Sequence, residues 1–233
     1  MKINVVMPTL YGYRTNSYLP QVTEALIVQL EKSGYEYTLT TLGRDNPEYN
    51  KFTNDKIIKK YVGGLEGINT TRGMNAELAA MADEDIFCLF HDDLFIDHMD
   101  WVKMFVETYN KESLKCGVLG VLSHSQSVMG YVGWNLFEAS YTNGNFFVKA
   151  KYIRCGFEEA LAEECGDLDL CNEQMVNYRK NYIVCIPHRH YMTPYQVTFS
   201  YLKDFKKTLG RCRKHLNEKW LKRVPNNDWS KYK

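Results

Sequence analysis

The chain has 233 residues and a formal net charge of +1, with 45% hydrophobic and 24% charged residues, the composition of a folded globular protein. No apolar run approaches the roughly 18 residues that span a bilayer, and the apolar block at residues 3–8 is too short for a signal peptide. The seven cysteines are odd in number and contain no Cys-x-x-Cys pair, which argues against a disulfide framework or zinc knuckle and predicts a reducing, cytoplasmic setting.

The first elements predicted along the chain are a strand and a helix. Residues 3–7 form a short apolar run that predicts a strand closed by a proline. Leucine and valine then recur at helical spacing over residues 19–30. Asn16 or Ser17 is the expected N-terminal cap of this helix, and Gly34 its end.

A second strand and helix are expected next. Residues 35–42 are rich in Tyr, Thr and Leu and predict a strand, which ends in turn residues at 43–47. A glycine-rich loop at residues 63–67 precedes an apolar helical face, with Thr70 or Thr71 as the expected cap.

The middle of the chain continues this alternation. Residues 86–90 and 117–122 predict buried strands, and residues 101–109 a helix between them. A later strand is expected at residues 182–186. Alternating strands and helices predict an α/β fold with a doubly wound, mainly parallel sheet.

An aromatic, glycine-rich region covers residues 130–147. It is interpreted either as strands crossing the mouth of a site, with Trp134 as a stacking surface, or as ordinary aromatic core packing.

The strand at residues 86–90 ends on His91, Asp92 and Asp93. Open α/β sheets bind ligands beyond the carboxyl ends of their strands, and paired carboxylates there suit a hard divalent cation and the phosphates it accompanies. The alternative is that the two aspartates simply open a turn.

Three further clusters carry candidate chemistry. Arg72 and Asn75 lie one turn apart near the start of a predicted helix, where a guanidinium and the helix N-terminus suit a diphosphate. Asp167 and Asp169 alternate in an acidic stretch and would point the same way if the backbone is extended. Residues 188–190, His-Arg-His, follow the late strand. Taken singly, these residues could equally be a surface ion pair, helix caps and half-buried polar side chains.

The order of these motifs resembles that of GT-A glycosyltransferases of the family-2 type. The matching segments are Val5-Val6-Met7-Pro8-Thr9, Gly67 with Arg72 and Asn75, His91-Asp92-Asp93, Gly166-Asp167-Leu168-Asp169, and His188 or His190. The resemblance implies a GT-A domain over residues 1–195, with a mainly parallel, Rossmann-like sheet, followed by a helical extension over residues 196–233. It also implies an enzyme that moves a sugar from a nucleoside-diphosphate sugar to an acceptor hydroxyl with inversion.

For the donor, the resemblance implies that Pro8, Thr9 and Tyr11 line the base and ribose, with Arg44 or Asp45 nearby. It further places a diphosphate near the helix that carries Gly67, Arg72 and Asn75.

For the chemistry, the resemblance implies that Asp93 binds Mn²⁺ or Mg²⁺, that Asp92 orients the ribose or a metal-bound water, and that His188 or His190 completes the metal shell. Asp167 is implied as the base that takes the acceptor proton. Two positions depart from the family pattern: His91 stands where an aspartate is expected, and Gly166 where the family often has a glutamate.

The last 32 residues are strongly basic, with eleven Lys or Arg against three acids, whereas the first 201 residues carry 18 bases and 25 acids. Apolar residues recur among these bases at helical spacing. Such a helix could dock on its own domain with solvated charges, lie on an anionic membrane near lipid-linked acceptors, or follow the phosphates of DNA whose hydroxylated base is the acceptor. A glycan acceptor is equally compatible with the resemblance. A different class of function, a non-catalytic module that binds a nucleotide sugar, is the alternative to an enzyme. The sequence leaves the oligomeric state open.

Overall fold

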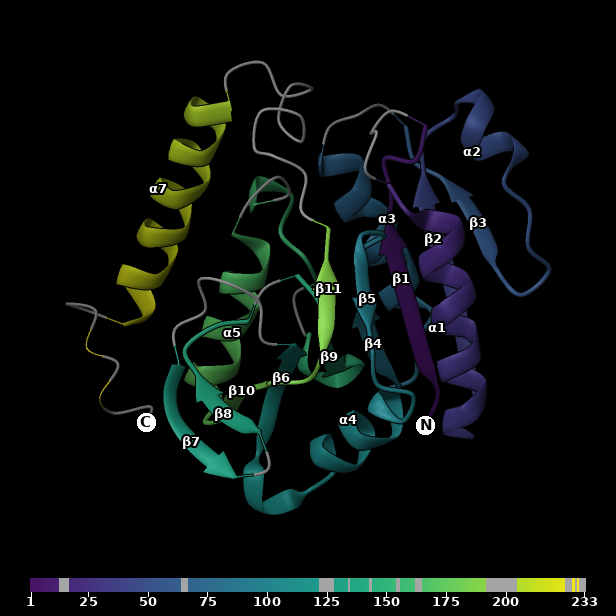
Figure 1. Cartoon of the computed structure of the whole chain (residues 1–233). Helices are drawn as coiled ribbons and strands as arrows, with labels where there is room; N and C mark the ends of the chain where they lie inside the picture. The colour runs from purple at the N-terminus through teal and green to yellow at the C-terminus, as the bar shows by residue number, and fades with distance from the viewer. Residues whose placement is uncertain are drawn as a thin grey trace.

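The computed structural model describes residues 1–12, 17–63, 67–121, 128–133, 135–142, 144–153, 156–161, 165–191, 205–224, 228 and 230. Its centre is a nine-stranded sheet in the order β3-β2-β1-β4-β9-β6-β10-β8-β7 (Figure 1). The strands are β1 (Ile3–Pro8), β2 (Tyr37–Gly43), β3 (Ile58–Tyr61), β4 (Ile86–Leu89), β6 (Cys116–Val121), β7 (Val128–Gly133), β8 (Leu136–Ala139), β9 (Phe146–Lys149) and β10 (Lys180–Val184).

Most strands of this sheet run in the same direction. β1 is parallel to both β2 and β4, β2 is parallel to β3, and β6 is parallel to β10. β9 is inserted antiparallel between β4 and β6, and β8 is antiparallel to β10 and β7. The predicted α/β class with a mostly parallel central sheet is confirmed.

Helices cover both faces of the sheet. Along β1, Ile3, Val5 and Met7 join one hydrophobic core with α1 (Leu19–Ser33) and α4 (Trp101–Tyr109), whereas Val6 joins a second core with α3 (Gly67–Ala79) and α5 (Gly166–Val176). This alternation follows from the two-residue period of a strand, which sends successive side chains to opposite faces.

The helix starts differ from the expected ones. α1 begins after Tyr18 with no side-chain cap, because the Ser17 hydroxyl donates instead to Asp92; Asn16 lies outside the described residues. The predicted end of α1 is confirmed, since Gly34 adopts the left-handed conformation with φ 74°. α3 already begins at Gly67, so Thr71 is a buried helical residue and not a cap.

Several short elements were not predicted. Asn46 caps α2 (Pro47–Lys51) by accepting from two backbone amides, where the sequence indicated only a turn. β5 (Leu94–Ile96) pairs antiparallel with β11 (His188–His190) in a separate two-stranded sheet. Three 3₁₀ helices complete the described elements: η1 (Glu112–Leu114), η2 (Ala150–Tyr152) and η3 (Glu159–Leu161).

The sequence predicted that Asp167 and Asp169 point the same way only if the backbone is extended, and the backbone there is helical. Asp167 and Asp169 lie in the first turn of α5, so their side chains diverge. Residues two apart on an α-helix are separated by more than half a turn, whereas on a strand they would share a face. The aromatic region forms β7, β8 and the start of β9, while Trp134 lies outside the described residues.

The basic C-terminal segment contains the helix α7 (Phe205–Arg223), seen apart from the sheet in Figure 1. Its apolar side, consisting of Cys212, Leu216 and Trp220 with the following Val224, is buried against Leu161 of η3. This packing agrees with the alternative in which the helix docks on its own domain. The predicted boundary between residues 195 and 196 falls outside the described residues.

Within the described parts of the chain, no helix combines the length and apolar composition needed to cross a bilayer.

Candidate active site

The site lies at the edge of the sheet where β1, β2 and β4 end. The amide of Phe90 still pairs with the carbonyl of Val6 at 3.1 Å, after which the chain turns through residues 91–93 into β5. Because β9 is antiparallel to β4, it begins at the edge where β4 ends, and Phe146 faces Leu89. The pairing therefore brings residues 144 and 145 beside the turn at His91.

His91, Asp93 and His190 form a group whose potential ligand atoms all lie within 4.8 Å of one another. His190 Nε2 is 3.2 Å from Asp93 Oδ1, and the centres of the two imidazole rings are 6.2 Å apart. Imidazole nitrogens and a carboxylate oxygen are suitable ligands for a divalent cation, so the donor set fits a bound metal ion. We call these three residues the cation group.

The two other predicted metal-site residues lie apart from this group. The Asp92 carboxylate is 3% exposed, and its Oδ2 accepts hydrogen bonds from the hydroxyls of Thr9 and Ser17, each at 2.5 Å. His188 places Nδ1 2.8 Å from the carbonyl oxygen of Ile186. Of the two histidines on β11, the structure brings His190 to Asp93, and among the described residues His188 is not part of the group.

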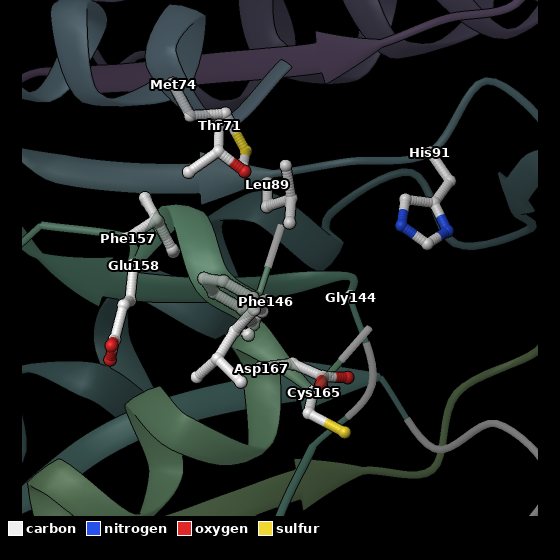
Figure 2. Close-up of a pocket in the computed structure, with 12 residues that line it drawn as sticks. Thr71, Met74, Leu89, His91, Gly144, Phe146, Phe157, Glu158, Cys165 and Asp167 are labelled. Atoms are coloured by element: carbon white, nitrogen blue, oxygen red, sulfur yellow. The ribbon is translucent and has the colours of Figure 1, made fainter. Parts of the chain in front are cut away.

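A pocket of about 240 Å³ is lined by both Asp167 and His91, one of the three residues of the cation group (Figure 2). In the figure, the imidazole of His91 lies at one side of the pocket, Thr71 and Met74 above it, and Asp167 and Cys165 below. The walls of the pocket are largely apolar and come from α3, β4, η3 and the start of α5. The lining residues are Thr71, Met74, Leu89, His91, Gly144, Phe146, Phe157, Glu158, Leu161, Cys165, Gly166 and Asp167.

The pocket is lined by two carboxylates, Asp167 and Glu158, whose pKa values are shifted in opposite directions. Burial raises the pKa of Asp167 above its ordinary value, although the amide of Leu168 donates to its Oδ1 at 2.8 Å. Burial also tends to raise the pKa of Glu158, but hydrogen bonds from Lys219 and His215 outweigh it, and the pKa is lowered. Asp167 is therefore the better proton acceptor of the two at neutral pH.

The residues that were predicted to contact the nucleotide lie together at the neighbouring strand ends. The Tyr11 amide donates to the Thr9 hydroxyl at 3.0 Å, directly after Pro8 at the end of β1. Arg44 follows β2, is 6% exposed and donates to the Thr70 hydroxyl at 2.9 Å. Asp45, next to Arg44, is exposed and accepts a hydrogen bond from Asn50.

The residues predicted on α3 lie differently. Arg72 is on the surface, where its guanidinium makes two hydrogen bonds to Glu159 at 2.8 and 2.9 Å. The Asn75 carboxamide exchanges two hydrogen bonds with the backbone of Phe157, at 2.7 and 2.8 Å. The helix turns Thr71 and Met74 into the pocket instead, since residues three apart share a face. Gly67 is the first residue of the helix, and a diphosphate contact for these residues remains a prediction.

Sequence reasoning assigned no part in the site to several of these residues, among them His91, Thr71, Glu158 and Cys165. His91 carried the one available signal, because it directly precedes the two aspartates at a strand end. The other three come together only through tertiary packing.

No protein-family model and no curated protein matches this chain. Solved structures do match in fold. The solved fragment of S. aureus TarS, residues 1–349, superimposes with a TM-score of 0.55 at 13% identity, covering 97% of this chain and 74% of that fragment. A Drosophila beta-1,4-galactosyltransferase 7 mutant, in complex with manganese, UDP-Gal and xylobiose, gives a TM-score of 0.57 at 11% identity, covering 90% and 79% of the two chains.

A third similar structure is a 4-diphosphocytidyl-2C-methyl-D-erythritol synthase, with a TM-score of 0.56 at 13% identity and coverage of 86% and 97%. The expected GT-A-type fold is thereby confirmed. At identities of 11–13%, these superpositions show a shared fold and do not show a shared activity.

Proposed function

We propose that this protein is a metal-dependent, inverting glycosyltransferase that moves a sugar from a nucleoside-diphosphate sugar to an acceptor hydroxyl. The observation that carries the proposal is that one pocket is lined by both the Asp167 carboxylate and His91 of the cation group. An inverting transfer needs a base for the acceptor hydroxyl next to a positive charge on the departing diphosphate, and this pocket joins a candidate for each.

The donor nucleotide is proposed to bind over the ends of β1 and β2. Pro8, Thr9 and Tyr11 would line its base and ribose, and Arg44 would offer donors from the end of β2. Asp92, held by Thr9 and Ser17, would keep this loop in place beside the ribose.

The cation is proposed to bind between Asp93 and His190, as Mn²⁺ or Mg²⁺. A bound cation of this kind supplies electrostatic stabilisation of the charge that develops on the diphosphate. Asp93→Ala should therefore abolish metal-dependent nucleotide binding, which titration calorimetry measures directly.

The proposed transfer is a single displacement. The acceptor oxygen attacks the anomeric carbon, and the bond from that carbon to the diphosphate oxygen breaks with its electron pair leaving on the diphosphate. The acceptor proton passes to the Asp167 carboxylate. Since the raised pKa of Asp167 increases its basicity, burial in this pocket favours that role.

The acceptor hydroxyl is proposed to belong to a glycan, a lipid-linked sugar or a hydroxylated DNA base. The basic helix α7 packs on η3, which itself lines the pocket, so an anionic acceptor would meet positive charge close to the reaction site.

The proposal is tested by incubating the protein with Mn²⁺ and a panel of nucleotide sugars and measuring release of nucleoside diphosphate. We expect slow hydrolysis of one donor, and Asp167→Asn should lower turnover by more than tenfold while leaving donor affinity nearly intact, since positioned acid–base groups contribute about 10²–10⁴-fold. Retention of more than a tenth of turnover would rule out Asp167 as the base.

The same panel separates two rival functions. A non-catalytic nucleotide-sugar-binding module would bind a donor without releasing nucleoside diphosphate. A nucleotidyltransferase would release pyrophosphate from CTP in the presence of a sugar or polyol phosphate.

A further inference from the structure

Backbone pairing fixes Asp93 and His190 relative to each other. β11 pairs antiparallel with β5, with His190 opposite Leu94, and the Tyr191 amide donates to the Asp93 carbonyl at 2.9 Å. The two side chains approach to 3.2 Å across this ladder. His190 is therefore placed by the β5–β11 ladder, and Asp93 by the turn that directly precedes β5 and by its backbone hydrogen bond to Tyr191.

His91 is held in the group from its other side. The buried side chain of Asn145 accepts from the His91 amide at 2.7 Å and lies 3.4 Å from its Nδ1. Gly144 makes room for the ring, because a Cβ atom at this position would lie 2.6 Å from His91 Nε2. These contacts hold the imidazole in place beside the turn.

Asp92, the other carboxylate of this turn, is directed elsewhere. Its Oδ2 accepts from both Thr9 and Ser17, and it is not among the side chains that gather within 4.8 Å in the described residues. The group consequently offers two imidazoles and one carboxylate.

We propose that His91 is a third metal ligand and that this donor set makes the site selective for first-row transition-metal ions over Mg²⁺. Imidazole suits transition ions, which follow the affinity order Mn²⁺ below Co²⁺, whereas Mg²⁺ prefers an all-oxygen shell. The inference deepens the proposed function, because it specifies the cation and a selectivity residue of the same site.

The first test is titration calorimetry of the full chain with Co²⁺, Mn²⁺ and Mg²⁺, with no nucleotide sugar present. We expect Co²⁺ to bind more tightly than Mn²⁺, and at least about tenfold more tightly than Mg²⁺. His91→Asp exchanges an imidazole for a carboxylate, so the ratio of Co²⁺ to Mg²⁺ affinity should fall by at least about tenfold. The matched control His98→Asp makes the same exchange outside the cation group and should leave the ratio unchanged.

A second measurement uses the unaltered protein, so it does not depend on the variant folding. Pulsed electron paramagnetic resonance of the Mn²⁺-loaded chain detects each coordinated imidazole nitrogen. Two coupled imidazoles support His91 as a ligand, and a single one overturns the proposal.

Equal affinity for Mg²⁺ and Co²⁺, or an unchanged ratio in folded His91→Asp, would also overturn it. The proposed transferase activity can fail separately: selective Co²⁺ binding with no turnover of any nucleotide sugar refutes the activity and keeps the metal site. Turnover supported equally by Mg²⁺ and Co²⁺, together with equal affinities, refutes the selectivity and keeps the activity.

Discussion

Asp167 and Asp169 belong to one short motif, but their side chains contact different parts of the molecule. In the first turn of α5, Asp167 faces the pocket, whereas Asp169 accepts hydrogen bonds from Lys219 and Trp220 of α7 at 2.7 and 2.8 Å. One carboxylate thus lines the pocket and is the proposed base, and the other attaches the C-terminal helix.

The buried position of Asp167 leads to a prediction about pH. Below its raised pKa this carboxyl group is protonated and cannot accept the acceptor proton, so activity should be lost on acidification at a higher pH than for an exposed aspartate. The measurement is kcat/KM against pH at saturating cation, which separates this effect from protonation of the histidine ligands.

The nearby Glu158 provides an internal comparison, because its pKa is lowered and it stays ionised over the same range. If kcat/KM falls only at the lower pH at which an exposed aspartate becomes protonated, the proposed role of Asp167 is contradicted.

At the scale of elements, α7 is attached to the domain by both apolar and polar contacts. Lys219 donates to Glu158 and Asp169, each at 2.7 Å, and so bridges the pocket wall and α5. Trp220 is 3% exposed in the apolar cluster between α7 and η3.

Trp220→Ala should therefore destabilise the whole domain. The variant loses the buried ring and leaves Asp169 without its indole donor, and large-to-alanine changes of this kind cost about 3–5 kcal/mol. Urea denaturation followed by circular dichroism measures the free energy of unfolding. Leu221→Ala is the control, because Leu221 is 45% exposed and its loss should cost no more than about 0.5 kcal/mol. An unchanged main transition in Trp220→Ala would mean that α7 folds as an independent appendage.

The elements that sequence reasoning found are those with strong local patterns. β1, α1 and α4 combine regular apolar spacing with clear end signals. β3 is an exposed edge strand and β5 has only three residues, so neither has enough buried positions to show a period. For α5, the alternation of aspartate and leucine resembled a strand, and the tertiary contacts of the helix outweighed that local pattern.

The same limit applies to the site. Strand-end chemistry indicated Asp92 and Asp93, since it depends on local sequence and sheet topology, whereas the role of Asp167 was implied by the resemblance to family-2 glycosyltransferases. The choice of His190 over His188 depends on the register of β11 against β5, which is a long-range property. The pairing of Arg72 with Glu159 likewise joins segments distant in sequence.

The distribution of charge is a property of the whole molecule. Exposed cations on α7 include Arg213, Lys214 and Lys222, in a chain whose first 201 residues are acidic overall. Binding to duplex DNA and to anionic vesicles, each measured over a salt series, discriminates between the acceptors. Steep loss of DNA affinity with salt and no vesicle binding is expected for a DNA acceptor, and the reverse preference for a lipid-linked one.

A paired substitution attributes any such binding to α7. Lys214→Glu with Lys222→Glu should weaken it, whereas Lys103→Glu, on the exposed side of α4, should not. Absence of binding to both DNA and vesicles would favour a neutral glycan acceptor and a helix whose charges are simply solvated.

The pairing of β5 with β11 also determines when the proposed cation site can form during synthesis. Asp93 and His190 are about 100 positions apart, so a nascent chain can complete β1 to β4 long before the histidine leaves the ribosome. Until then only His91 and Asp93 of the cation group have been synthesised. The proposed cation site can therefore form only after its two distant segments have paired, which would make cation binding a late event during synthesis.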